Sequence, residues 1–217
     1  MFINIHTHQP PATGEWALQN LGENPAEIRV PGCYSAGIHP WQISPFHWEK
    51  QMDTLRRVSR LPGVLAIGEC GLDKACATPF PLQETVFAAQ VQWAHTIGKP
   101  LVIHCVRAWE ELLSALQQLP DRVPVIFHGF NKNETLAKRI TGKGYYISLG
   151  KALQKPAMQQ VLAAVAPDHF FLETDDEELS IQTVYDWAAN ALSIDHNSLV
   201  LQIQKNAVAV FGAAVQL

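Results

Sequence analysis

The chain has 217 residues, of which 47% are hydrophobic, and a formal net charge of −4. This length and apolar content suffice for one sizeable core, so we expect a single domain over residues 1–217. The net negative charge excludes a general electrostatic attraction to nucleic acid or to anionic membranes. No apolar run approaches the roughly 20 residues that a membrane-spanning helix needs, and no signal-peptide core is visible, so we expect a cytoplasmic protein. Without CxxC spacing, its four cysteines are expected to be reduced thiols: Cys33, Cys70, Cys76 and Cys105.

Two histidines follow the apolar run at the start of the chain. Phe2 to Ile5 predicts a buried strand that leads into His6 and His8. Side chains alternate between the two faces of an extended chain, so these two imidazoles point the same way. Such a pair is typical of half of a metal site, with the other ligands supplied from elsewhere. A chance histidine pair near the terminus is the alternative.

Strand-like and helix-like segments then alternate to the end of the chain. Further strands are predicted over 16–21, 33–38, 64–67, 101–103, 125–127, 145–149 and 170–172. Apolar residues at helical spacing predict helices over 48–60, 82–97, 109–116, 136–140, 156–165, 184–191 and 199–211. Ser44 and Pro45 predict the cap and first turn of the first of these helices. Residues 25–32 are predicted to be mainly loop, and no helix is evident between residues 9 and 33.

Apolar strands that alternate with helices predict a parallel α/β sheet. About eight such strands are visible, and polar residues gather at their C-terminal ends. A (β/α)8 TIM-like barrel places its chemistry at these ends. Because the chain is short, we expect a distorted barrel that lacks one or two outer helices; an open sheet is the alternative.

The ionisable side chains at the predicted strand ends form the candidate site: His6, His8, Glu69, His104, His128 and Asp175. In a barrel these ends meet at one mouth, so the six side chains are expected to lie together. Taken singly, His104 or His128 is more commonly a core residue bonded to the backbone, and Glu69 alone is also typical of a structural ion-pair partner. Burying all six without compensation is costly, which favours bound cations.

Several short motifs occur in a characteristic order along the chain: Asn4-Ile5-His6-Thr7-His8, Ala36-Gly37-Ile38-His39-Pro40, Ile67-Gly68-Glu69-Cys70-Gly71-Leu72-Asp73, Ile103-His104, Phe127-His128-Gly129-Phe130 and Leu172-Glu173-Thr174-Asp175. With these motifs the chain resembles the TatD DNase family of metal-dependent hydrolases in the amidohydrolase superfamily. The resemblance implies a distorted TIM barrel, divalent metal ions and phosphodiester hydrolysis, typically as a deoxyribonuclease. DNA or another phosphodiester is then the expected substrate.

The resemblance also implies a role for each site residue. His6, His8 and Asp175 would hold one metal ion, His104 and His128 would hold a second, and Glu69 would bridge the two. Glu69 and Asp175 are the catalytic candidates, with Asp175 orienting or deprotonating the attacking water. Two ions per chain are expected, and the mixed ligands suit Zn²⁺, Mn²⁺, Mg²⁺ or Ni²⁺ without selecting among them.

Further side chains are weaker candidates. His39, Arg107 and Lys74 are candidates for binding a substrate phosphate, with a loop histidine and solvated surface cations as the alternatives. The tryptophans are interpreted as packing residues rather than base-stacking platforms: Trp41, Trp48, Trp93, Trp109 and Trp187. The oligomeric state is left open, monomer included.

The sequence departs from the family pattern in several places. Asn4 stands where the family usually has aspartate, and the acidic run Asp176-Glu177-Glu178 follows Asp175. Carboxylates beside the site repel a polyanion unless they point outward. Two other functions therefore stay open: hydrolysis of an amide, lactone or small phosphoester by the same metals, and an inactive barrel that serves as a binding protein.

Overall fold

The structure is a computed structural model that describes residues 1–21, 32–117 and 123–215. It contains eight strands: β1 (Phe2–Thr7), β2 (Glu15–Asn20), β3 (Cys33–Ala36), β4 (Val64–Asp73), β5 (Leu101–Val106), β6 (Val125–Phe127), β7 (Tyr146–Leu149) and β8 (Phe170–Leu172). The strands follow one another in chain order in one sheet, and the pairs with assigned register are parallel. The α/β class and TIM-like (β/α)8 topology predicted from the sequence are confirmed. Residues 25–31 of the loop predicted over 25–32 lie outside the described residues.

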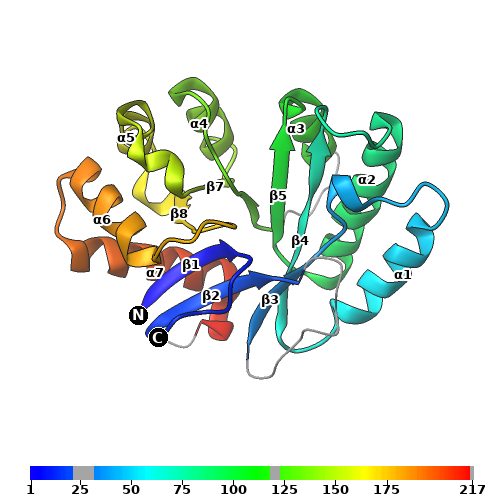
Figure 1. Ribbon diagram of the computed structural model, residues 1–217, viewed down its shortest axis with the longest axis horizontal. Helices are drawn as coiled ribbons and strands as arrows, with labels where there is room; N and C mark the ends of the chain where they lie inside the picture. Colours follow the sequence, from blue (N-terminus) through cyan, green and yellow to red (C-terminus); the bar gives the residue numbers. More distant parts are fainter. Residues whose placement is uncertain (22–31, 118–122, 216–217) are drawn as a thin grey trace. The chain divides into compact units, whose positions relative to one another are not determined.

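Among the described residues, the α-helices begin after β3 and then follow the strands in turn (Figure 1): α1 (Trp48–Val58), α2 (Phe80–Ile97), α3 (Trp109–Gln117), α4 (Glu134–Thr141), α5 (Pro156–Ala163), α6 (Ile181–Leu192) and α7 (His196–Phe211). Short 3-10 turns accompany them: η2 (Pro40–Gln42), η3 (Lys151–Gln154), η4 (Pro167–His169) and η5 (Gly212–Ala214). The described chain between β1 and β2 holds no helix. An outer helix is therefore missing there, as predicted.

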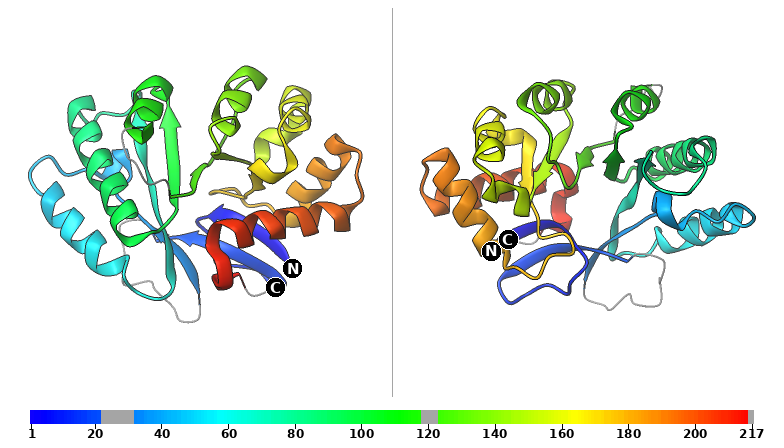
Figure 2. Two further views of the ribbon diagram at one scale, coloured as in Figure 1. Left: turned by 180° about the vertical axis from the view of Figure 1, so that it is seen from behind. Right: turned by 45° about the horizontal axis from the view of Figure 1, so that its top comes forward.

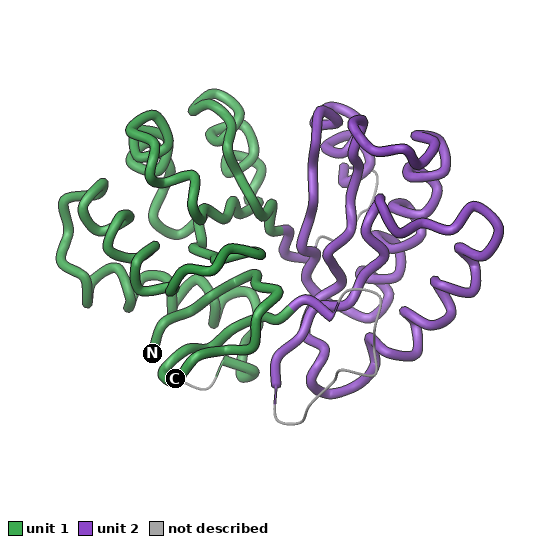
Figure 3. Tube along the Cα trace, viewed as in Figure 1, with its two compact units in different colours: residues 1–19, 126–217 green, residues 20–125 purple. Residues whose placement is uncertain are grey.

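The chain divides into two compact units (Figure 3). Residues 1–19 and 126–217 form the first unit, and residues 20–125 form the second. The single domain over residues 1–217 stays a prediction.

In the second unit, α2 packs along β4, and α3 packs against β5 (Figure 2). β4 continues to Asp73, six residues beyond the predicted end at Ile67. Gly71 explains the difference, because a Cβ atom on it would lie only 1.9 Å from the carbonyl oxygen of His104 on β5. The glycines that suggest a strand end in the sequence thus allow close strand pairing instead.

The predicted cap and first turn of α1 at Ser44 and Pro45 are wrong. The helix begins at Trp48, with His47 in the cap position, and not at Ser44. Ser44 instead donates its backbone N–H to Oε1 of Gln51, and Nε2 of Gln51 donates to the carbonyl of Gln42. These bonds join the loop before the helix to the first turn of the helix, so Ser44 stabilises the loop and does not cap α1.

In the first unit, α6 and α7 pack against β1, and α7 also packs against β8 (Figures 1 and 2). The hydroxyl of Tyr185 on α6 lies 3.1 Å from both the backbone nitrogen and the carbonyl oxygen of Ile3. This buried hydroxyl takes the place of a neighbouring strand along the first part of β1. It thereby satisfies backbone groups that would otherwise be costly to bury.

The four cysteines are free thiols, as predicted. Cys70 is completely buried, and this burial raises the pKa of its thiol above the ordinary value, with the charge of Glu69 adding to the effect. Among the described residues, no helix has both the length and the apolar content needed to cross a bilayer. The cytoplasmic location stays a prediction.

Candidate metal centre

The ends of β1 and β8 are joined in the first unit, and this pairing gathers three predicted ligands. The N–H of His8 donates to the carbonyl of Asp175 at 2.9 Å, and the N–H of Asp175 donates to the carbonyl of His6 at 3.0 Å. Asp175 has a φ of 56°, in the left-handed region that aspartate tolerates better than most residues. The backbone pairing therefore sets all three side chains at the same place.

The two histidines approach a single carboxylate oxygen. Nε2 of His6 lies 3.4 Å and Nε2 of His8 lies 3.5 Å from Oδ1 of Asp175. His6 is fully buried, whereas the side chains of His8 and Asp175 are 39% and 35% exposed. The predicted alternation of His6 and His8 onto one face is confirmed, and we call these three residues the first cluster.

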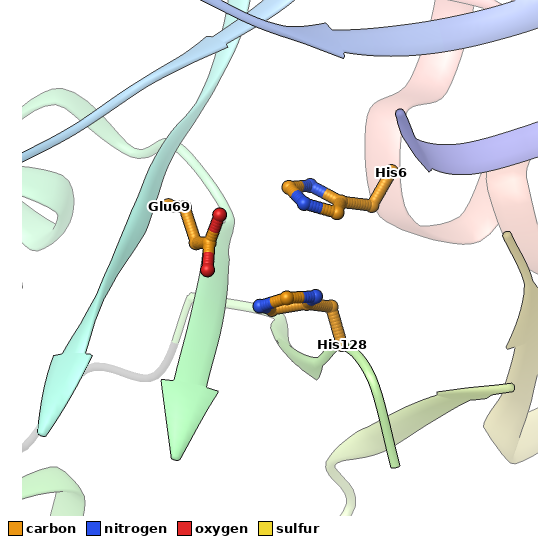
Figure 4. Close-up of side chains that lie close together, drawn as sticks. All are labelled: His6, Glu69 and His128. Carbon is orange, nitrogen blue, oxygen red and sulfur yellow. The ribbon is translucent and has the colours of Figure 1, made fainter. Parts of the chain in front are cut away.

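His128 and Glu173 adjoin this cluster within the same unit. The imidazoles of His6 and His128 have ring centroids 4.2 Å apart (Figure 4). Ligand atoms of His128, Glu173 and Asp175 also lie within 4.8 Å of one another. Burial raises the pKa of the Glu173 carboxyl, and the negative charge of Asp175 raises it further. The electrostatic interactions with His128 and His6 lower it, but the pKa stays above its ordinary value. Glu173 is held by the backbone N–H of Gly129, which donates to its Oε1 at 2.6 Å.

The second unit contains a group of ligand-type side chains around Glu69, which projects from β4 (Figure 4). Its Oε1 lies 3.0 Å from Nδ1 of His104 and 3.2 Å from Nε2 of His39. Its Oε2 accepts a hydrogen bond from Nδ2 of Asn20 at 3.2 Å. Glu69 is buried, and we call Glu69, His39 and His104 the second cluster.

Asp73 supports the second cluster from the end of β4. Its Oδ2 lies 3.4 Å from Nε2 of His104 and accepts a 2.6 Å hydrogen bond from the indole N–H of Trp41. Burial alone would lower the pKa of His104, but the carboxylates of Glu69 and Asp73 outweigh burial and raise it. For Asp73, burial raises the pKa, yet the hydrogen bonds from Trp41 and the Ala75 N–H, together with His104, lower it overall.

The donor atoms of both clusters fit a divalent cation. In each, two imidazole nitrogens and one carboxylate oxygen lie within 4.8 Å of one another. Three mixed nitrogen and oxygen ligands are typical of catalytic sites, where further positions stay open for water or substrate. Such a cation would also offset the cost of holding buried carboxylate and imidazole groups together.

The structure groups the predicted ligands in a partly unexpected way. His39, predicted to contact substrate, lies with Glu69 and His104, while His128 lies with Glu173 and Asp175. His104 and His128 are predicted to hold one ion, and Glu69 is predicted to bridge this ion and the ion at His6, His8 and Asp175. These residues belong to different units, and the arrangement stays a prediction. Asp73 and Glu173 are not among the predicted site residues, although both stand in the strand-end motifs beside predicted ligands.

Lys74 and Arg107, the two basic residues predicted to bind a substrate phosphate, lie on the surface of the second unit. The ammonium of Lys74 is paired with the carboxylate of Glu111. Arg107 is exposed and has a φ of 55° at the end of β5. Their phosphate-binding role stays a prediction. Trp48, Trp93, Trp109 and Trp187 are at least partly buried, as expected of packing residues, but Trp41 is 66% exposed, so the interpretation of Trp41 as a packing residue is wrong.

The acidic run after Asp175 is partly neutralised. Both carboxylate oxygens of Glu177 lie 2.8 Å from Nζ of Lys151, whereas Asp176 and Glu178 are exposed. The repulsion that this run exerts on a polyanion is therefore smaller than its three formal charges indicate.

Comparison with known proteins places the chain in a family. The profile of the family described as TatD related DNase matches residues 19–212, a range that begins after His6 and His8. The protein named 3'-5' ssDNA/RNA exonuclease TatD from Cronobacter turicensis is 32% identical over 158 residues, which cover 68% of this chain and 58% of that protein. The chain thus matches less than two thirds of the length of such relatives.

Solved structures show the same fold. YJJV, a TatD homolog from Escherichia coli, superposes with a TM-score of 0.81 at 22% identity over 98% of both chains. A hydrolase TatD family protein from Entamoeba histolytica superposes with a TM-score of 0.81 at 15% identity over 97% of both chains. The family profile covers most of the chain. The chain belongs to the TatD-related DNase family.

Proposed function

We propose that this chain is a metal-dependent phosphodiesterase that acts on single-stranded nucleic acid. The observation that carries the proposal is the presence, in each unit, of two imidazoles gathered on one carboxylate. The relatives named as single-stranded DNA and RNA exonucleases support the choice of substrate. We also propose two divalent ions per chain.

The ligands follow from the two clusters. His6, His8 and Asp175 would hold one ion, and Glu69 with His39 and His104 would hold another. A divalent ion bound at either cluster would lower the pKa of a water molecule attached to it. It would also offset the negative charge of the phosphoryl oxygens of the substrate. His128 and Glu173 support the first cluster from the side, in the way that ligands are commonly oriented by neighbouring groups.

Asp175 is the proposed base. Its side chain is 35% exposed and its Oδ1 already faces two imidazoles, so its carboxylate reaches both the cluster and solvent. A carboxylate in that place can accept a proton from an attacking water. Glu69 is more deeply buried and is held by Asn20, which suits a ligand whose position must stay fixed.

The proposal is tested by hydrolysis of single-stranded DNA and of bis(p-nitrophenyl) phosphate by metal-stripped protein. Mg²⁺, Mn²⁺, Zn²⁺ or Ni²⁺ is added back, with Glu69→Ala and Asp175→Asn run in parallel and His47→Ala as an exposed histidine control. We expect metal-dependent turnover that falls more than about 100-fold in the two cluster variants and is unchanged in the control. No turnover above the variants with any metal would contradict the proposal and direct attention to amide and lactone substrates.

A further inference from the structure

Trp41 is unusually exposed for its type and lies beside the second cluster. It exposes 66% of its surface, and Phe46, in the same connection between β3 and α1, exposes 85%. Tryptophan is among the residues that bury most of their surface on average. The indole ring lies 4.8 Å from the ring of His39 and 6.0 Å from that of His104, measured between centroids. An aromatic surface is thus presented to solvent directly next to two candidate ligands.

The position of this ring is fixed from more than one side. Its Nε1–H donates to Oδ2 of Asp73 at 2.6 Å, and the backbone N–H of Trp41 donates to Nδ1 of His39 at 3.2 Å. Trp41 also stands within η2, where the neighbouring Pro40 is buried. A ring that is already ordered loses little conformational entropy when a ligand stacks on it.

The net negative charge of the chain favours a ligand that is held by more than phosphate contacts. The chain has a net charge of −4, and the ammonium of Lys74 is engaged by Glu111. Proteins that grip single strands combine phosphate contacts with aromatic rings on which bases stack, and stacking does not depend on base identity. On a chain of net negative charge, stacking has to carry a larger part of the affinity.

We propose that the exposed face of the Trp41 indole stacks on the heterocyclic base of a nucleotide whose phosphate is bound at the second cluster. The inference rests on the proposed function and adds a base-binding residue to it. Asp73 is the positioning residue, since it links the indole N–H to Nε2 of His104. Trp41 would then hold the base and the second cluster the phosphate of the same nucleotide, and hydrogen bonds through Asp73 connect the two.

The test compares two ligands that differ only in the base. Calorimetry measures the binding of thymidine 5′-monophosphate and of 2-deoxyribose 5-phosphate to the Mn²⁺-loaded protein. The variants are Trp41→Leu, which removes the aromatic face, and Trp41→Phe, which keeps one. Leu201→Ala is the control, because Leu201 is 57% exposed on α7 of the other unit. Circular dichroism confirms that each variant is folded.

We expect the nucleotide to bind the wild-type protein about tenfold more tightly than the sugar phosphate. Trp41→Leu should reduce this ratio to less than about twofold and leave the affinity for the sugar phosphate unchanged, while Trp41→Phe and Leu201→Ala keep a clear preference. A folded Trp41→Leu variant with the full preference, or a wild-type protein with none, would overturn the inference. If the protein nevertheless hydrolyses phosphodiesters, the proposed function stands; if it neither hydrolyses them nor binds either ligand, both fail.

Discussion

The amide nitrogen of Asn4 lies 2.6 Å from Oε1 of Glu15, and it also donates to Oγ1 of Thr174 at 2.8 Å. The amide oxygen accepts the backbone N–H of Thr174 at 3.1 Å. Asn4 is buried, and its amide is the donor that lets β1 pack against the Glu15 carboxylate. An aspartate at this position would place two carboxylates in contact.

We therefore predict that Asn4→Asp destabilises the fold. The change removes two donated hydrogen bonds at a buried site and adds charge repulsion, so the free energy of unfolding at pH 7 should fall by about 2 kcal/mol. Urea denaturation measures this. Adding Glu15→Gln to Asn4→Asp should restore most of the loss, since the new amide can donate to the aspartate. Equal stability of Asn4→Asp and the wild type would show that the pair with Glu15 is not needed.

Tyr185→Phe should also destabilise the protein. The change leaves the buried backbone N–H and carbonyl of Ile3 without the hydroxyl that now satisfies them, at a cost of about 2 kcal/mol. Tyr146→Phe is the matched control, because no hydrogen bond is assigned to its half-buried hydroxyl among the described residues. It should change the free energy of unfolding by less than about 0.5 kcal/mol. Similar losses in both variants would mean that the bonds to Ile3 do not matter.

Gln90 holds the backbone next to the second cluster. Its Oε1 accepts the N–H of Ile38 at 2.7 Å, and its Nε2 donates to the Ile38 carbonyl at 3.1 Å, one residue before His39. Gln90→Leu frees this segment and should weaken Mn²⁺ binding at the second cluster about tenfold. The exposed Gln92→Leu on the same helix should have no effect. Manganese titration decides the matter, and equal affinities in both variants would exclude a positioning role for Gln90.

Gly71 is predicted to be essential to the β4–β5 pairing. It has a φ of 153°, and an added Cβ would meet the His104 carbonyl oxygen at 1.9 Å. We expect Gly71→Ala to cost about 3 kcal/mol or more in the free energy of unfolding. Gly98→Ala is the control, since Gly98 caps α2 with a φ of 65° and has open space around it. Its cost should be about 1 kcal/mol. Comparable losses would show that contact with β5 is not the reason for Gly71.

Much of the fold could be predicted from the sequence because the buried strands are short apolar runs that each end in a polar residue. The pairing of His6 with His8 followed from strand alternation alone, and the structure confirms it. The length of β4 could not be predicted, since glycines that permit close pairing look like a strand end when the neighbouring strand is unknown. The place of His39 beside Glu69 likewise depends on contacts between β3 and β4.

For Asn4 and Trp41 the residue type is evident in the sequence, but the role of the side chain follows only from its contacts in the structure. From the sequence, Asn4 is only a neutral residue where the resemblance implies an acidic one. Its hydrogen bond to Glu15 shows why an amide suits the position. Trp41 appeared as one packing tryptophan among several, because hydrophobicity alone does not tell an exposed ring from a buried one. Its hydrogen bond to Asp73 identifies it as a fixed, solvent-facing residue.

The most direct test of the account is the number of Mn²⁺ ions bound per chain, measured by equilibrium dialysis. We predict two for the wild-type protein, one for His8→Ala, one for His39→Ala and two for the exposed control His47→Ala. Loss of a single ion in each cluster variant would show that the first and second clusters are both metal sites. A wild-type protein that binds no Mn²⁺, or cluster variants that bind as many ions as the control, would contradict the account.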